Sequence, residues 1–434
     1  MIKISDAKVG IISGLSTLRG KDMSKLEELI QQYCPDGVEY ARLGDFATQW
    51  YRGAGIKKDE VGQEGIPCIR YGEIHTAYKI WFDKCVSHTD EAKQPSKKYA
   101  DYGDILFAIT SEDIPFIGNS VAYVGKERIM VGGDIVVMKH TQNPKYISYA
   151  LSTIDAVGQK GKGKVKSKVV HTNVPSLKEI VIPLPPLPVQ EEIVRILDNF
   201  TELQAELQAE LQAELQKRKQ QYNYYLDNLL SFNRGGQTEV KWMKMSEVAS
   251  FTYGYTSKAQ DLGNVRYIRI TDITDKGQLN PKNGKYVSLT EEVRPYLLKK
   301  GDLIMARTGA TYGKTLYYNE DYPSAYASFL IKITLNQLVD SKYYWHFTRS
   351  SIYWEQANRL VGGGAQPQFN TGAISQVNIP LPSLEEQNRI VSILDRFDTL
   401  TNDLTAGLPA EIEKRRQQYE YYRDKLLTFK RKEA

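Results

Sequence analysis

The sequence predicts an α+β protein built from two tandem copies of one module, in which a mixed, strand-rich domain is followed by a long helix. An internal repeat separates equivalent residues by about 197 positions. Apolar residues in the two repeated segments recur every three or four positions, which indicates helices. The remaining segments alternate short apolar runs with Gly, Asp and Asn, which indicates strands and turns.

The repeat is gapless over about sixty residues at its strongest. Residues 193–200 read IVRILDNF and residues 390–397 read IVSILDRF, an offset of 390 − 193 = 197. Upstream the match is weaker but keeps its order, and Gly103-Asp104 aligns with Gly301-Asp302. This layout divides the chain into an N-terminal extension (1–22), a first variable domain (23–169), a first constant segment (170–232), a second variable domain (233–366) and a second constant segment (367–434).

Both constant segments carry the apolar stripe of a long helix. The stripes consist of Ile193, Leu197, Phe200, Leu203, Leu207, Leu211 and Leu215 in the first segment and of Ile390, Leu394, Phe397, Leu400 and Leu404 in the second. One helix over 190–230 would be about 60 Å long. Gly407 and Pro409 predict a kink or break in the second helix. We expect the stripes to bury each other; the alternative is that each helix packs on its own domain.

A short tandem repeat lies inside the first helix. Glu202-Leu203-Gln204-Ala205 is followed by near copies as far as Leu215, and all four residue types favour helices. Each four-residue copy turns the helix by 400°, so the apolar stripe drifts by about 40° per copy. The tract is therefore expected to be a stiff spacer.

The variable domains are expected to be rich in strands. Candidate strands are 104–109, 135–138, 266–270 and 303–307, and helical patches are expected near 145–154 and 341–359.

A search for catalytic motifs favours a chain without a cofactor or metal site of its own. Residues 309–315 are one position short of a phosphate loop and are followed by a predicted strand, and residues 158–164 lack the hydroxyl residue after the lysine. The spacing of Cys68, His75, Cys85 and His88 fits no usual zinc site. No methyltransferase signature or nucleophile–base motif is recognisable.

Composition limits the setting of the protein. No apolar run approaches the ~18 residues of a membrane span. The first twenty residues do not resemble a signal peptide, and the odd number of cysteines, 3, predicts a reducing cytoplasm.

Basic and aromatic residues predict an anionic partner. The net charge is +5, and the sequence contains 29 Tyr. Lysines alternate with small residues from Lys160 to Lys168, which suits phosphate contact or a solvated loop. Arg70 and Arg269 occupy matching positions and either contact bases or form a shared structural ion pair. The candidate contact residues are Arg52, Arg70, Tyr71, Lys160, Lys162, Lys164, Lys166, Tyr253, Tyr255, Lys258, Arg266, Arg269, Arg307 and Lys314.

The constant segments resemble those of the specificity subunits of type I restriction–modification enzymes. The resemblance rests on IPLPPL at 182–187, QEEIVRILD at 190–198, the second copy from Ile379 to Phe397, and the opening from Leu26 to Tyr40. The tandem Gln-Ala-Glu-Leu units are similar to short repeats that some members carry. The match covers nearly the whole chain from Met23, so residues 1–22 precede the usual start; either this extension is native or Met23 is the initiator.

This resemblance implies a division of labour. Each variable domain would be a DNA target-recognition domain for one half of a split site in double-stranded DNA, and the helices would form an antiparallel coiled coil that sets the gap. Two modification subunits, which bind S-adenosylmethionine, and restriction subunits, which use ATP and Mg²⁺, would be the partners. Two other interpretations stay open, a self-sufficient DNA methyltransferase or nuclease with unrecognised motifs and a coiled-coil adaptor that binds no DNA.

Overall fold

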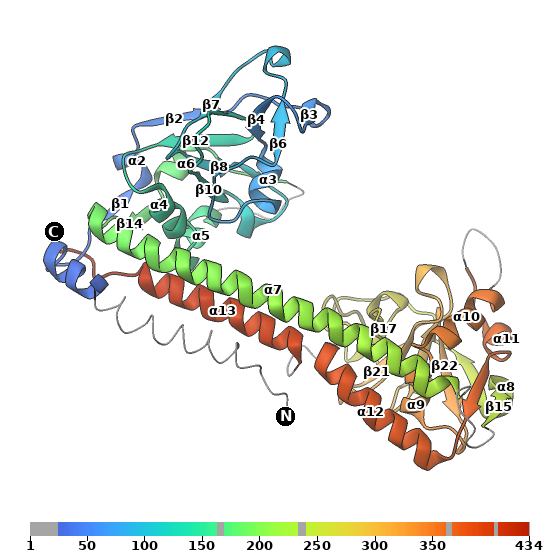
Figure 1. Cartoon of the computed structure of the whole chain (residues 1–434). Coiled ribbons are helices and arrows are strands. Elements are labelled where there is room, and N and C mark those ends of the chain that lie inside the picture. Colours follow the sequence, from blue (N-terminus) through green and yellow to red (C-terminus); the bar gives the residue numbers. More distant parts are fainter. Residues whose placement is uncertain (1–24, 163–168, 233–239, 362–366, 403–406, 434) are drawn as a thin grey trace. The chain divides into compact units, whose positions relative to one another are not determined.

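A computed structural model describes residues 25–162, 169–232, 240–361, 367–402 and 407–433. The chain forms two compact units that are not consecutive in the sequence. Unit 1 contains residues 1–209 and 413–434, and unit 2 contains residues 210–412. Both long helical segments therefore contribute to both units (Figure 1).

Unit 1 is built on two five-stranded sheets. The first has the order β2 (Gln49–Arg52), β12 (Ile135–Lys139), β8 (Ile105–Ala108), β10 (Ser120–Tyr123) and β5 (Trp81–Phe82). The second has the order β3 (Val61–Gly62), β6 (Ser87–Thr89), β4 (Ile66–Ile69), β11 (Ile129–Val131) and β7 (Tyr99–Ala100). Two small pairs join β1 (Tyr40–Arg42) to β14 (Val181–Pro183) and β9 (Thr110–Ser111) to β13 (Val170–His171). The predicted strands at 104–109 and 135–138 are confirmed as β8 and β12.

Short helices cover the sheets of unit 1. They are α2 (Leu43–Phe46), α3 (Tyr71–Thr76), α4 (Pro144–Leu151), α5 (Ile154–Gly161) and α6 (Val174–Lys178). The predicted helical patch at 145–154 corresponds to α4, which Ser152 ends before α5 begins.

Unit 2 repeats this plan with fewer strands. Its larger sheet has the order β16 (Ala249–Tyr253), β22 (Leu330–Leu335), β19 (Leu303–Ala306) and β20 (Thr315–Tyr317). The smaller sheets are β18 (Tyr286–Val287), β17 (Val265–Ile268) and β21 (Ser324–Tyr326), and the pair of β15 (Lys241–Lys244) with β23 (Asn378–Leu381). Its short helices are α8 (Met245–Val248), α9 (Ser341–Phe347), α10 (Ser351–Leu360) and α11 (Thr371–Ile374). The predicted helical patch at 341–359 is thus two helices.

The long helices agree with the periodicity. The first is α7 (Leu187–Ser231), which is continuous through the tandem repeat. The second segment is broken as Gly407 and Pro409 predict, since α12 (Leu384–Asn402) ends before α13 (Leu408–Leu426) begins. Within the described part of the chain, no helix combines the length and hydrophobicity that crossing a membrane requires.

The predicted apolar stripes are largely buried. Ile193, Leu197, Ile390 and Leu394 are fully buried, and Leu207, Leu211 and Leu215 are also buried within the tandem repeat. Phe200, Leu203, Phe397 and Leu400 are half-buried, and Leu404 lies outside the described residues. Both expectations for the stripes hold in part, because the helices share cores with each other and with a domain.

Each unit combines the start of one long helix with the end of another. In unit 1, Leu197 of α7 shares a core with Leu426 of α13, and the hydroxyl of Thr201 hydrogen-bonds that of Tyr419 at 2.8 Å. Because the later residue of α7 meets the earlier residue of α13, the two helices run antiparallel there. In unit 2, Tyr225 at the end of α7 stacks on Phe397 of α12, with ring centroids 5.3 Å apart.

The constant segments hold both domains by the same hydrogen bonds. Gln190 and Gln387, 197 residues apart, each accept a backbone N–H at the start of a short helix, from Asn143 at 3.1 Å and from Asp340 at 2.9 Å. A buried tyrosine hydroxyl on that helix donates to a proline carbonyl in each unit, from Tyr146 to Pro183 and from Tyr343 to Pro380. The repeated residues therefore attach each domain to its long helices in the same way, and we call this shared set of contacts the frame.

Candidate nucleic-acid interface

The two larger sheets present equivalent edge strands, β2 in unit 1 and β16 in unit 2. Arg52 of β2 pairs with Val136, and Tyr253 of β16 pairs with Ile331. Val136 in turn pairs with Phe107 in β8, and Ile331 pairs with Met305 in β19. Since β8 and β19 begin at the repeated Gly-Asp, Arg52 and Tyr253 are equivalent positions.

In unit 1 this position carries an exposed arginine. The Nε of Arg52 donates to the carbonyl of Gly133, and its Nη2 pairs with Asp134 at 2.6 Å. The side chain of Arg52 is 60% exposed. Its charge is therefore presented to solvent but is already balanced by a carboxylate.

In unit 2 a guanidinium reaches the same place from a different strand end. The Nε of Arg307, which follows β19, donates at 3.1 Å to the carbonyl of Ser328, the residue equivalent to Gly133. The guanidinium lies 5.2 Å from the ring centroid of Tyr253 and 5.4 Å from that of Phe329. Tyr253 and Phe329 are 43% and 53% exposed, so this cation–aromatic cluster faces solvent.

We call these two exposed surfaces rims: Arg52 with Asp134 in unit 1, and Tyr253, Arg307 and Phe329 in unit 2. The rims differ in charge although the strands that carry them pair in the same way. Phe329 stands where unit 1 has Asp134, and in the described part of the chain no carboxylate pairs with Arg307. A guanidinium with free donors beside exposed aromatic rings can bind phosphate or a guanine edge. Sequence reasoning selected Arg52, Tyr253 and Arg307 but missed Phe329, for which only the sheet register gives a signal.

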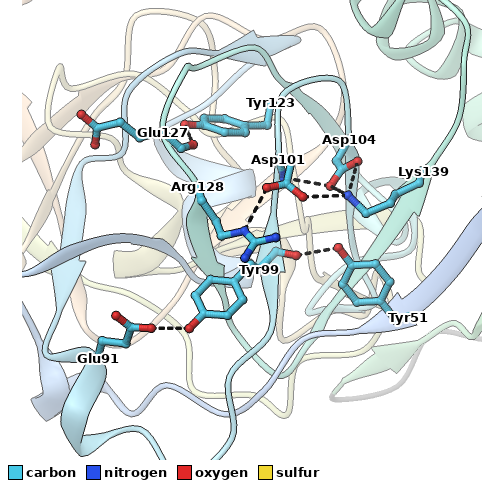
Figure 2. A network of polar contacts seen from close by, with 9 residues as sticks. All are labelled: Tyr51, Glu91, Tyr99, Asp101, Asp104, Tyr123, Glu127, Arg128 and Lys139. Atoms are coloured by element: carbon cyan, nitrogen blue, oxygen red, sulfur yellow. Dashed lines mark hydrogen bonds and ion pairs between the residues drawn. The ribbon is translucent and has the colours of Figure 1, made fainter.

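A polar network fixes β2 beneath the rim of unit 1 (Figure 2). The hydroxyl of Tyr51 donates to the carbonyl of Tyr99, which joins the two five-stranded sheets. Lys139 donates to both Asp101 and Asp104, and Arg128 donates to Asp101. The hydrogen bond from Arg128 lowers the pKa of Asp101, whereas burial raises the pKa of Asp104. Lys139 and Arg128 are thus committed to the scaffold.

A second exposed group lies beside α3 in unit 1. Tyr71 is 40% exposed and packs edge-to-face on His75. The ring of His75 hydrogen-bonds the carbonyl of Thr110, and the hydroxyl of Thr110 contacts the ring of His171. Because these groups have mixed donor and acceptor character, they suit contacts with bases or backbone. The two histidines were not among the sequence candidates.

Two predicted contact residues lie inside the fold. Arg266 is buried, and its Nη2 donates to the carbonyl of Asn280. Lys160 is also buried, and its ammonium donates to the carbonyl of Leu151 at 2.8 Å and to the hydroxyl of Ser120 at 3.4 Å. These placements contradict direct DNA contact, because both side chains point into the domain. Alternation with glycine in the sequence gave no sign that Lys160 is enclosed.

Arg70 and Arg269 form the shared structural ion pair that the sequence left open. Arg269 pairs with Asp272 at 3.0 Å, and Arg70 lies 3.9 Å from Glu73. In both units the carboxylate also accepts the backbone N–H of its arginine. This repeated arrangement starts a short helix after the strand in both units.

The remaining candidates are spread over both domains. Lys162 and Lys258 are exposed, whereas Lys314 pairs with Asp275 and the Tyr255 hydroxyl donates to Glu292. Lys164 and Lys166 lie outside the described residues.

The residues weighed in the sequence as a zinc site or a phosphate loop lie in other arrangements. Burial raises the pKa of Cys68 and of Cys85 to about 12, so both thiols stay protonated. Among the described residues, no three His, Cys, Asp or Glu side chains gather to hold a metal ion. Gly309–Thr311 is a single 3-10 turn followed by the strand β20, so this loop does not lead into a helix as a phosphate loop does.

Comparisons with known proteins agree with the duplicated plan. A family model described as the type I restriction modification DNA specificity domain matches residues 35–217 and again residues 238–414. The specificity subunit of the type I restriction enzyme EcoR124I/EcoR124II of Escherichia coli is 37% identical over 313 residues, 67% of this chain and 72% of that protein. A putative type I restriction enzyme specificity subunit of Haemophilus influenzae is 36% identical over 276 residues, 62% of this chain and 68% of that protein.

Solved structures share the fold at low sequence identity. A chain from a structure describing complex assembly and conformational transition of the type I R-M system matches with a TM-score of 0.65 and 16% identity, covering 90% of this chain and 97% of that one. The HsdS subunit from Thermoanaerobacter tengcongensis matches with a TM-score of 0.50 and 16% identity, covering 91% and 96%.

Proposed function

The chain belongs to the family of type I restriction–modification specificity subunits, and on this premise we propose that units 1 and 2 each read one half of a bipartite DNA site. Members of this family are non-catalytic and supply sequence specificity. One observation supports the half-site assignment. The two units place an arginine, Arg52 or Arg307, at equivalent points of the same backbone arrangement, but the side chains around the two arginines differ. Different surroundings of the two guanidiniums suit different base sequences.

The candidate contacts for each half-site are the accessible ones. For unit 1 they are Arg52, Tyr71 and Lys162, with Lys164 and Lys166 as expected phosphate contacts. For unit 2 they are Tyr253, Lys258 and Arg307, joined by Phe329.

The partners follow from the duplicated frame. Two similar surfaces, each made from the start of one long helix and the end of another, suit two modification subunits that bind S-adenosylmethionine. Restriction subunits that use ATP and Mg²⁺ would join this core. Native mass spectrometry at saturation should show two modification subunits for each chain. A limit of one modification subunit would contradict the proposal.

The tandem repeat in α7 would set the distance between the half-sites. The contact of Thr201 in unit 1 and that of Tyr222 in unit 2 lie on either side of the repeat, and α7 is one continuous helix between them. Removing four residues shortens a helix by about 6 Å and rotates it by a net 40° or so. One base pair advances the duplex by about 3.4 Å and turns it by roughly 34–36°. We expect one base pair of spacer for each repeat, with small bends absorbing the excess length.

The test is to delete Gln204–Leu207 and map methylation across the genome. A gap shortened by about one base pair with unchanged half-sites supports the proposal. Altered half-sites or an unchanged gap would contradict it. The purified chain, incubated with S-adenosylmethionine and DNA, should transfer no methyl group, and methyl transfer would favour a self-sufficient enzyme. The adaptor alternative predicts that the chain with its modification partners shifts no DNA in a gel.

A further inference from the structure

A cavity of about 320 Å³ lies within unit 2 between the end of α7 and the strand β20. Its lining includes the side chains of Lys219, Lys276, Lys314 and Arg349, against a single carboxylate, that of Asp275. Asp275 is already paired with Lys314. The cavity therefore has an excess of positive charge, and its volume is within the range of small-ligand pockets.

One buried donor in this cavity lacks an acceptor. The guanidinium of Arg349 uses Nη2 to pair with Asp398 at 2.7 Å, but its Nη1 is buried and has no hydrogen-bond partner. Across the described ranges, no ion pair joins Lys219 or Lys276 to a carboxylate. Burial and the charge of Lys219 lower the pKa of Lys276, whereas the charge of Asp398 opposes this shift and that of Arg349 adds to it. A buried donor without a partner is costly, so the Nη1 of Arg349 has capacity for one further hydrogen bond to a bound group.

The equivalent place in unit 1 is filled by the protein itself. There the ammonium of Lys160 donates to the carbonyl of Leu151 and to Ser120. The residues equivalent to Leu151 and Ser120 are Thr348 and Thr315, and both line the cavity of unit 2. The residue equivalent to Lys160 is Ala357, whose short side chain leaves this part of the cavity open.

Aromatic rings and threonine hydroxyls line the cavity beside the cationic groups. Arg349 lies 5.0 Å from the ring centroid of Tyr222, and the ring of Trp354 borders the same space. The hydroxyls of Thr348 and Thr315 donate to backbone carbonyls, so their protons are already used within the protein. Two ammonium groups and one guanidinium edge around an open space match the several acceptor oxygens of a phosphate.

We propose that this cavity of unit 2 binds a phosphate group. The inference goes beyond the reading of half-sites, since Lys160 occupies the equivalent place in unit 1. A phosphate of the DNA backbone and the phosphate of a free nucleotide present the same oxygens, and both would bind by this chemistry.

The experiment titrates inorganic phosphate and pyrophosphate into the full chain by calorimetry, with KCl holding ionic strength constant. We expect saturable binding that Lys219→Gln/Lys276→Gln weakens by about tenfold or more, because it removes two charge-assisted donors. The charge-preserving variant Lys219→Arg/Lys276→Arg should bind within about threefold of the parent. The matched control Lys282→Gln/Lys299→Gln removes two exposed lysines of the same unit and should change nothing.

A second arm identifies the source of the phosphate. If saturating duplex DNA abolishes phosphate binding, the natural occupant is the DNA backbone, and if binding persists, it is a free nucleotide or phosphate. Either result supports the site. The proposal is overturned if phosphate binding does not saturate, if chloride alone gives the same heats, or if the glutamine and control variants bind equally.

Discussion

Tyr149 of unit 1 and His346 of unit 2 hold equivalent positions, and each hydrogen-bonds the aspartate of the long helix that follows its domain. The hydroxyl of Tyr149 donates to Asp198 at 2.8 Å, and the Nε2 of His346 lies 2.9 Å from Asp395. Burial lowers the pKa of His346, which favours the neutral ring. The frame thus accepts a change of residue type if one hydrogen bond to the helix is kept.

At the rims, by contrast, equivalent positions do not keep the same interaction. Arg52 and Tyr253 are equivalent, as are Asp134 and Phe329, yet neither pair shares a chemical property. Within the described residues, no hydrogen bond or ion pair joins these four positions to the long helices. We therefore expect stability and specificity to depend on different residues of the same domain, and the following variants test this separation.

Substitutions that leave a cavity in the core between a long helix and its domain should have the largest effect on stability. Leu197→Ala and Leu394→Ala each remove a fully buried side chain, from the core of unit 1 and of unit 2 respectively. Each should lower the free energy of unfolding of its own unit by about 2–5 kcal/mol. Amide hydrogen exchange should show faster exchange in that unit, and Ser392→Ala, at an exposed position on α12, is the control. Equal loss of protection in both units would show that they do not open separately.

The rim variants come next. Arg307→Ala should weaken binding of the assembled methyltransferase to its DNA by about 1–3 kcal/mol and relax only one half-site. Arg52→Ala should have a smaller effect, because Asp134 already balances the charge of Arg52. Affinities for duplexes randomised in one half or the other provide the measurement, and Lys282→Ala is the surface control. Relaxation of both half-sites by one variant would refute the assignment of one unit to one half.

The frame could be predicted from the sequence because its signals are local or repeated. The period of the stripe gave α7, Gly407 and Pro409 gave the break before α13, and the offset of 197 paired Gln190 with Gln387. The ion pairs of Arg70 and Arg269 also had a signal, an acidic residue three positions later in each copy.

The site was harder to predict because it depends on strand register. Arg307 follows β19 whereas Arg52 belongs to β2, so no alignment of the two copies brings them to one point. The burial of Lys160 depends on the packing of α5 over β10, and alternating lysines read as exposed when only the chain is considered. Tertiary contacts, rather than propensity, decide both cases.

Lys160 supplies a third difference between the units and a pH test. Burial lowers the pKa of its ammonium to about 7, below the 10.5 of an exposed lysine. The unfolded chain therefore binds more protons than the folded one between these values, and stability rises with pH across that window. The destabilisation is complete below pH 7 and fades as the pH approaches 10.5.

Lys160→Met should remove this dependence. We expect its advantage in the free energy of unfolding over the parent to shrink by roughly 1 kcal/mol per pH unit between pH 7 and 10. Chemical denaturation at several pH values measures it, and Lys162→Met, at an exposed position, is the control. A constant difference between the variant and the parent would mean that the amine stays charged in the fold.

The smallest expected effect concerns the ends of the long helices. Asp424 of α13 accepts the backbone N–H of Ile154 at 3.0 Å, and Asp227 of α7, 197 residues earlier, accepts that of Ser351 at 2.9 Å. Each carboxylate thus satisfies a donor at the first turn of a short helix, and Asp227→Ala should cost about 0.5–1 kcal/mol. Asp424→Ala should cost about 1 kcal/mol more, because Asp424 also pairs at 2.6 Å with the buried Arg423, whose charge would lose its partner.

Unit 2 has Leu226 at the position of Arg423, so Arg423→Leu should cancel the excess when combined with Asp424→Ala. A double-mutant cycle on the free energy of unfolding measures this coupling, and equal costs for the two aspartates, or no coupling, would show that Arg423 does not distinguish the units.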